Sequence, residues 1–188
     1  DCFSEAQVKI NKKNVFVLRL RNENKTDAVN DSDEISRTIQ KNRSSLRAEH
    51  KFLLGQGSYF RFRGEFCLVS FDGVESEESG WAGFAEVRCR LTSFLKTGVR
   101  YSLFDTESYH SAIWQFETFV PGTMYSAPLY GSGMRWNLYF SVDVLDIADI
   151  WLKYSETVKN NTDSMGSGIT EITGSSKRNI TLQAEISF

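Results

Sequence analysis

The last eleven residues of the chain, 178–188, alternate between apolar and polar side chains after the first two positions. One parity carries Ile180, Leu182, Ala184, Ile186 and Phe188. A period of two places each set of side chains on its own face of a β-strand. The run has the length that a tilted strand needs to cross a bilayer, and it ends on an aromatic residue. We interpret it as the closing strand of an outer-membrane β-barrel.

The same alternation recurs along the chain and predicts about ten further strands. The runs cover residues 5–10, 16–21, 45–54, 60–68, 81–91, 95–103, 112–118, 123–131, 134–144 and 149–155, of which 123–131 is weaker because Pro128 removes a ladder donor. About eleven strands is an odd number, whereas bacterial single-chain barrels have even numbers. We therefore expect the C-terminal part of a larger antiparallel up-and-down transmembrane barrel. The alternative is that 5–10 does not span.

Long polar connections and tight turns alternate between these runs. The long loops are expected at 22–40, 72–80, 105–110 and 160–177, and the turns at 11–14, 55–57, 93–94, 121–122 and 145–148. Outer-membrane barrels have short periplasmic turns and long outer loops. Counting back from a periplasmic C-terminus places all the long loops outside.

Charged residues inside the runs share one parity with their polar neighbours, except for His50, Glu156 and Arg178. A charge that faces lipid at the midplane costs roughly 2–4 kcal/mol, so a membrane wall would enforce this sorting. The expected lumen-facing charges are Arg19, Arg21, Arg47, Glu49, Lys51, Arg61, Arg63, Glu65, Glu86, Arg88, Arg90, Lys96, Arg100, Glu117, Arg135, Asp143 and Glu185. They would either favour anionic solutes in a channel or pair across strands as ladders that fill the lumen, and we favour the ladders. A plugged or partner-filled lumen also fits.

The opposite parity carries the residues that we expect to face lipid or to form interfacial aromatic girdles: Phe60, Trp81, Trp114, Trp136, Phe140, Ile186 and Phe188. A soluble lipocalin-like barrel that binds a small apolar ligand would use the same alternation turned inside out. About ten or more strands argue against it, because the apolar interior would be too wide to fill.

Composition excludes several other classes of protein. The hydrophobic content is 40%, the mean hydropathy is −0.35, and no apolar run reaches the length of a spanning helix. The net charge of −2 gives no argument for nucleic acid, and we expect none to be bound. The three cysteines, Cys2, Cys67 and Cys89, suggest neither a disulfide framework nor a metal site, and we expect no cofactor.

Catalytic chemistry has little support in the sequence. His110 lies in an expected outer loop with Asp105 and Glu107, a faint similarity to barrel-rim proteases. A hydrolase would also need an activated nucleophile or water and an oriented base, and no second motif supplies them. We therefore predict that the chain is not an enzyme.

Three stretches resemble one family: Tyr-Ser-Leu-Phe-Asp-Thr at 101–106, Pro-Leu-Tyr-Gly-Ser-Gly-Met-Arg-Trp at 128–136, and the tail from Trp151 to Phe188. The family is the C-terminal barrel of bacterial outer-membrane proteins that carry helix-hairpin-helix (ComEA-like) domains ahead of it. The match covers roughly the last ninety residues, and none of its motifs is catalytic. The resemblance implies an outer-membrane location, a lipid bilayer around the chain, and the upstream part of a longer parent chain or other envelope proteins as partners. DNA binding would belong to the helix-hairpin-helix part, so we assign it to no residue here.

Overall fold

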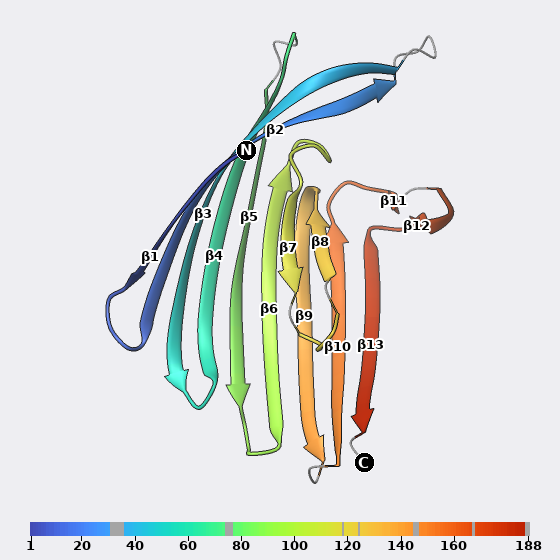
Figure 1. Cartoon of the computed structure of the whole chain (residues 1–188). Coiled ribbons are helices and arrows are strands. Elements are labelled where there is room, and N and C mark those ends of the chain that lie inside the picture. Colours follow the sequence, from blue (N-terminus) through green and yellow to red (C-terminus); the bar gives the residue numbers. More distant parts are fainter. Residues whose placement is uncertain are drawn as a thin grey trace.

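The structure, a computed structural model, describes residues 1–30, 36–73, 77–117, 119–123, 125–144, 147–166 and 168–186. Its main body is one nine-stranded antiparallel sheet in the order β1-β2-β3-β4-β5-β6-β9-β10-β13 (Figure 1). These strands are β1 (Cys2–Lys9), β2 (Asn14–Asn30), β3 (Ser36–Gly55), β4 (Ser58–Phe71), β5 (Glu77–Arg90), β6 (Leu95–Thr106), β9 (Gly131–Val144), β10 (Ala148–Lys159) and β13 (Ser176–Ile186).

Two short hairpins lie outside the main sheet. One pairs β7 (Ile113–Glu117) with β8 (Tyr125–Leu129), and the other pairs β11 (Ser164–Met165) with β12 (Ile172–Thr173). A single 3-10 turn, η1 (Gly168–Thr170), lies between β11 and β12. Among the described residues, no helix has the length and the apolar character needed to span a membrane.

The prediction of an antiparallel all-β fold is confirmed, but the sheet is open and does not close into a barrel. Its edges are β1 and β13, which pair only with β2 and β10. Because seven strands of the antiparallel sheet lie between β1 and β13, both edges run in the same direction (Figure 1). Closure would require further strands between them.

The connections of the main sheet sort by length between its two ends. At one end β1–β2, β3–β4, β5–β6 and β9–β10 are joined by tight turns, and the longer connections lie at the other end (Figure 1). The turn after β3 needs glycine, because Gly55 and Gly57 have φ angles of 102° and 79°. We call the two ends the turn end and the loop end.

The expected loop 22–40 is largely strand, which corrects the sequence prediction. β2 and β3 stay paired up to Asn30 and Ser36, beyond the reach of their neighbours β1 and β4, so this hairpin projects alone at the loop end (Figure 1). Only the ladder between β2 and β3 continues there, because the pairing of β1 ends at Asn22 and that of β4 at Lys41. The expected loop 72–80 is shortened in the same way, since β5 begins at Glu77.

The expected spanning strands 112–118 and 123–131 are also wrong. They form β7 and β8, each of five residues, which is too short to cross a bilayer. Residues 131–133, at the junction of the expected runs 123–131 and 134–144, begin β9, and Thr118 and Met124 lie outside the described residues. We call residues 107–117, 119–123 and 125–130 the inner segment.

The inner segment packs against one face of the main sheet, which we call the inner face. Side chains from β3, β4, β6, β9 and β10 bond to it, and Gly80 of β5 abuts it. Since one short segment reaches six neighbouring strands, the sheet must curve around it. The buried apolar core lies in this contact: Cys67, Ala82, Phe104, Ile113, Ala127 and Leu129 form one cluster, and Phe119, Val120, Tyr139 and Trp151 form another.

Candidate functional site

The inner face of the main sheet carries most of the charged side chains. Alternation along the strands places there Arg19, Arg21, Arg47, Glu49, Lys51, Arg61, Arg63, Glu65, Glu86, Arg88, Arg90, Lys96, Arg100, Arg135, Asp143 and Glu185. Many of them pair across adjacent strands: Arg19 with Glu5, Arg47 with Glu65, Arg63 with Glu49, and Lys96 with Asp143. Such pairing is what a charge ladder requires.

Glu86 is the centre of the most buried cluster on the inner face. Its carboxylate accepts hydrogen bonds from Arg100 Nε at 2.6 Å and from Arg61 NH2 at 3.0 Å. Tyr59 donates its hydroxyl at 2.7 Å, and the Nε of Arg88 lies 3.4 Å away. A lone carboxylate at this depth would be very unfavourable, so these partners are what allows Glu86 to be charged there.

Glu117 reaches the inner face from β7 of the inner segment and not from a strand of the main sheet, which corrects its expected position. Its side chain is 1% exposed and contacts Lys153 and Arg135, whose Nε donates to Oε1 at 2.7 Å. Burial raises the pKa of Glu117, but the hydrogen bonds and charges of Arg135 and Lys153 outweigh it and hold that pKa below its ordinary value. The carboxylate therefore fastens the inner segment to β9 and β10.

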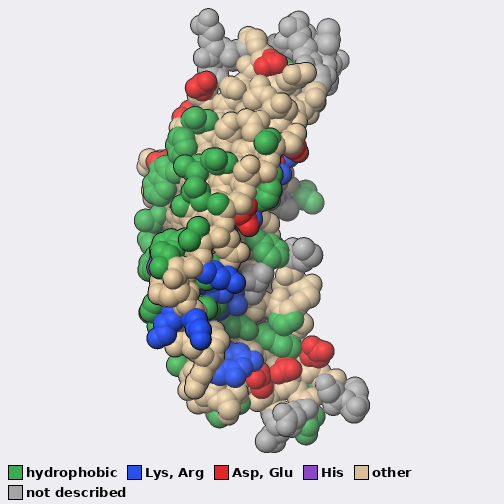
Figure 2. Space-filling view, turned by 60° about the vertical axis from the view of Figure 1, so that its left-hand side comes forward, with side chains coloured by type: hydrophobic (Ala, Val, Ile, Leu, Met, Phe, Trp, Pro, Cys, Tyr) green, Lys and Arg blue, Asp and Glu red, His purple; other side chains and the backbone are tan. Residues whose placement is uncertain are grey.

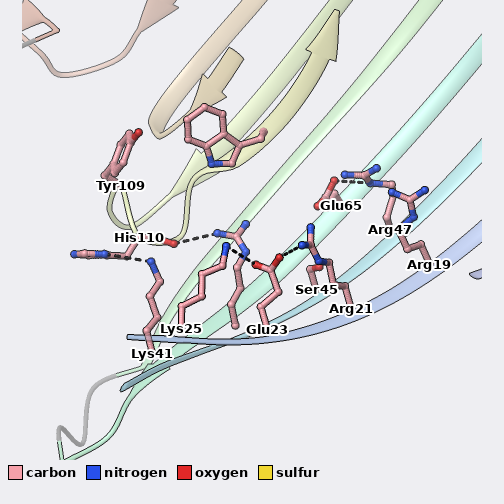
Figure 3. Close-up of a pocket in the computed structure, with 12 residues that line it drawn as sticks. Arg19, Arg21, Glu23, Lys25, Lys41, Ser45, Arg47, Glu65, Tyr109 and His110 are labelled. Carbon is pink, nitrogen blue, oxygen red and sulfur yellow. Dashed lines mark hydrogen bonds and ion pairs between the residues drawn. The ribbon is translucent and has the colours of Figure 1, made fainter. Parts of the chain in front are cut away.

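Part of the inner face stays open beside the inner segment and forms a cavity of about 560 Å³, which we call the basic cavity (Figure 3). It is lined by Arg19, Arg21, Glu23, Lys25, Lys41, Arg43, Ser45, Arg47, Glu65, Tyr109, His110 and Trp114. Six of these residues are Arg or Lys and two are Glu. The cavity therefore has an excess of positive charge.

The sequence prediction missed several residues of this cavity, namely Glu23, Lys25, Lys41 and Arg43. Glu23 and Lys25 fall inside the expected loop 22–40, and Lys41 and Arg43 lie between it and the expected run 45–54. All four nevertheless continue the parity of Arg21 and Arg47. Arg43 is positioned by the inner segment, because its guanidinium donates to the carbonyl oxygens of His110 at 3.0 Å and Ala112 at 2.8 Å. The signal that could have found them was the parity, extended past the end of the apolar run.

The expected catalytic neighbours of His110 do not converge on it. His110 lies in the inner segment, with Nδ1 3.3 Å from Lys41 Nζ. Glu107 instead accepts a hydrogen bond from the hydroxyl of Ser79 at 2.8 Å, and Asp105 points to the opposite face of β6. Among the described residues, no group of three or more His, Cys, Asp or Glu could hold a metal, and Cys2, Cys67 and Cys89 are all free thiols.

The opposite, outer face of the sheet is apolar. Phe60, Trp81, Trp136, Phe140 and Ile186 lie on it as expected, and Phe188 falls outside the described residues. Figure 2 shows hydrophobic side chains gathered over much of the surface on the side of the first strands. Trp114 is the exception, because it belongs to β7 and lines the basic cavity. The alternation around Trp114 reflects the two faces of the β7–β8 hairpin and not the two faces of the main sheet.

The apolar surface of the outer face is bounded by polar or charged side chains towards the loop end: Asn22 after Leu20, Ser70 after Leu68, Ser79 beyond Trp81, Asp105 after Leu103, Ser132 beyond Met134, Glu156 after Tyr154 and Arg178 beyond Ile180. From β4 to β9 the boundaries of paired strands lie within about two residues of one another, as Leu103 opposite Met134 illustrates. The boundary is stepped at β10, because Val158 lies beyond Glu156 and opposite Met134, whereas Tyr154 is opposite Ile180.

The charges that broke the parity rule have a structural explanation. Glu156 and Arg178 are register partners just beyond the boundary, and their side chains bond at 2.8 Å. His50 stacks on Phe16 with ring centroids 4.0 Å apart, and its Nε2 lies 3.0 Å from Asn14 Oδ1 near the turn end. Each exception is therefore paired and lies towards one end of the sheet.

The height of the apolar surface can be measured along a strand. Outer-face residues of β9 are apolar from Met134 to Val144, a span of ten residues or about 34 Å along the strand. At the tilt of about 40° common in barrels, this becomes about 26 Å, close to the roughly 25 Å apolar band of outer-membrane proteins.

Comparisons with protein-family models, curated proteins and solved structures found no match to this chain.

Proposed function

We propose that this chain is a wall segment of a bacterial outer-membrane β-barrel and has a non-catalytic role in transport, scaffolding or assembly. The observation that carries the proposal is the separation of the two faces of the curved sheet. The outer face has an apolar band bounded by polar side chains at the loop end, whereas the inner face holds the charges and the inner segment. A membrane around the sheet accounts for both faces at once.

Exposed apolar area on this scale supports the same proposal. The outer face leaves large side chains such as Leu18, Phe62 and Leu182 between 48% and 69% exposed. Water-soluble monomers rarely expose a contiguous apolar patch larger than a few hundred Å². The band crosses many strands of the main sheet, so lipid is the partner whose shape and chemistry fit it.

The inner segment sets the character of the proposed lumen. Its core contacts cover part of the inner face of β5, β6, β9 and β10. Open cavities remain on both sides of it, the basic cavity nearest β2 and β3 and one of about 390 Å³ beside β10 and β13. A parent barrel built on this wall would have a partly filled lumen with a basic passage or pocket. This arrangement suits selective passage or anchoring of a partner better than a wide unselective pore.

A soluble lipocalin-like barrel is the competing proposal, and the position of the inner segment argues against it. In such a barrel the apolar face would be the inside of the curve. Here the inner segment binds the charged face through Glu117, Gln115 and Arg43. The apolar face would then remain on the outside, without a partner.

The family resemblance noted above agrees with this proposal and adds a partner. On that reading the upstream part of a longer parent chain, or another envelope protein, would supply the strands that join β1 to β13. The open sheet provides two free edges for such strands.

Extraction and gel mobility test the proposal. We expect the full-length protein to need detergent for a monodisperse state and to migrate differently in gels before and after boiling. A matched pair of cysteine variants, in a Cys2→Ser background, tests its orientation. Ser175→Cys at the loop end should react with an impermeant maleimide on intact cells, whereas Lys12→Cys at the turn end should react only after permeabilisation. A protein that is monodisperse without detergent and shows no heat-modified band would refute the proposal.

A further inference from the structure

The basic cavity differs from the clusters around Glu86 and Glu117 because its charge is open to solvent. Its lining has six basic side chains against two carboxylates, a difference of +4 with His110 neutral, and Glu5, bound to Arg19, lowers this to +3. The clusters around Glu86 and Glu117 are covered by the inner segment, but Arg21 and Lys25 remain at least half exposed. Cations in a low-dielectric hollow attract anions more strongly than the same cations on a flat surface.

Several of the basic groups are held in place before any ligand arrives. Arg43 is fixed by two carbonyl oxygens of the inner segment, and Arg47 Nε by Glu65 at 2.7 Å. Two contacts leave Arg43 with further N–H groups of its five, arranged in the planar fork that matches phosphate oxygens. Held donors lose less conformational entropy on binding than free ones.

Glu23 partly neutralises the positive charge of the basic cavity. Its carboxylate contacts both Arg21 and Lys25, and its side chain is only 10% exposed. It therefore offsets two of the most accessible cations at the same point. Removing its charge should strengthen anion binding, whereas removing Arg21 should weaken it.

Aromatic rings of the inner segment form the other wall of the basic cavity (Figure 3). Tyr109 is 55% exposed and Trp114 is 47% exposed, and their ring centroids lie 6.3 Å apart in an edge-on arrangement. Tyr109 also packs edge-on against Tyr130 at 5.2 Å. Exposed rings beside arginines can stack on the flat face of a base or another ring.

We propose that the basic cavity binds a small solute that carries both a phosphate group and a ring. The phosphate would lie among Arg21, Lys25 and Arg43, and the ring would lie against Trp114 and Tyr109. The volume of about 560 Å³ falls within the range of small-molecule sites. This inference rests on the proposed function, since solutes reach the inner face only if it borders a lumen.

The experiment uses the full-length protein in detergent, titrated with adenosine 5′-monophosphate at low salt and followed by calorimetry. Inorganic phosphate and adenosine are titrated in parallel. Loss of one charge-assisted contact in Arg21→Gln should weaken the nucleotide's affinity roughly tenfold. Glu23→Gln should tighten it several-fold. Trp114→Ala should weaken binding of the nucleotide and leave inorganic phosphate unchanged.

The matched control is Lys12→Gln, an exposed lysine in the turn between β1 and β2 at the opposite end of the sheet, which should leave the affinity unchanged. Opposite effects of Arg21→Gln and Glu23→Gln would support the site, because unfolding would lower affinity in both. The proposal would be overturned if the nucleotide showed no saturable binding, or if Arg21→Gln and Glu23→Gln changed its affinity in the same direction. Equal affinity for the nucleotide and for inorganic phosphate would also overturn it. The detergent and gel tests above do not depend on binding, so failure of this site and failure of the membrane proposal are distinguishable.

Discussion

Replacing Glu117 by glutamine should loosen the inner segment without changing its shape. The side chain keeps its volume but loses the charge that faces Arg135 and Lys153, both of which are buried. Removing one partner from a buried ion pair typically costs 3–5 kcal/mol, because the remaining charge has no partner and no water. Two cations share this one carboxylate, and glutamine still offers an acceptor. We therefore expect a loss of about 3 kcal/mol in the free energy of opening.

Native-state proteolysis with chymotrypsin measures that opening. The inner segment is rich in aromatic residues, and cleavage follows the population of the open form when closing is fast. A loss of about 3 kcal/mol corresponds to roughly 100-fold faster cleavage within residues 107–130. Glu5→Gln is the control, because its pair with Arg19 is one-third exposed and such pairs contribute about 0–1 kcal/mol. Similar cleavage rates for the two variants would refute the claim that Glu117 fastens the inner segment.

The same carboxylate predicts a pH dependence. The pKa of Glu117 in the folded protein is below its ordinary value, so its contribution to stability is complete above the unfolded pKa of about 4.3. It is lost as the pH falls through the lower, folded pKa. Cleavage of the inner segment by pepsin should therefore rise steeply below about pH 4. In Glu117→Gln this step should be absent, and a step of equal size in both proteins would assign it to other carboxylates.

Two further substitutions, each with a matched control, test the apolar outer face and the contact between β5 and the inner segment. Val99→Lys puts a charge midway along the apolar stretch of β6 and should cost roughly 2–4 kcal/mol of stability in vesicles. Thr26→Lys, beyond the apolar boundary on β2, is its control and should cost little. Equal costs for the two variants would contradict a membrane band. Gly80→Ala would place its Cβ 2.7 Å from a carbonyl oxygen of the inner segment and should cost about 1–3 kcal/mol, as urea unfolding in detergent would show. Gly64→Ala meets nothing within 4 Å and should cause no loss; a loss as large as that of Gly80→Ala would point to the strand backbone instead.

The faces of the main sheet could be predicted from the sequence because a strand has a fixed period of two. Once the runs around Arg61, Glu86 and Arg100 are joined by consecutive hairpins, these side chains must fall on one face. The structure places Arg61 opposite Glu86 and Glu86 opposite Arg100. Tight turns fix the register of each hairpin, so the cross-strand pairs follow as well.

The inner segment could not be predicted in the same way. Alternation shows that a strand has two different faces, but it does not show which strand it pairs with. Trp114 and Glu117 have the same pattern whether β7 spans a membrane or packs on a sheet. The available signals were the shortness of the run 112–118, below the length of a spanning strand, and Pro128 within the run 123–131. The observed strands β7 and β8 are shorter still, with five residues each.

The basic cavity was missed because its residues come from two regions that the sequence prediction assigned wrongly or not at all, the stretch before residue 45 and the inner segment. Lys41 and Arg43 come from the stretch between the expected loop 22–40 and the expected run 45–54, which was assigned to no strand because its outer face is polar and gives no alternation. Trp114 and His110 come from the inner segment. No pattern in the chain relates these two regions, and only the curvature of the sheet brings them together.

The parity of the main sheet determines how a barrel could close. β1 and β13 run in the same direction, so an antiparallel barrel needs an odd number of strands between them. A second copy related by an axis along the barrel cannot supply them, because it would place β13 of one copy beside β1 of the other in parallel. At least one strand from outside this sheet must intervene. Two strand spacings amount to about 9.6 Å, beyond the roughly 7 Å between Cα atoms that a disulfide tolerates.

Cysteine pairs therefore test closure in the full-length protein. Gln7→Cys on β1 combined with a cysteine at Thr181, Gln183 or Glu185 of β13 should form no intramolecular disulfide under mild oxidation. The pair Glu5→Cys with Arg19→Cys is the positive control, because these positions are register partners across β1 and β2. Mass spectrometry after proteolysis identifies the linked peptides. A rapid disulfide between β1 and β13 would mean that the two edges meet directly in parallel, and the requirement for an intervening strand would be wrong.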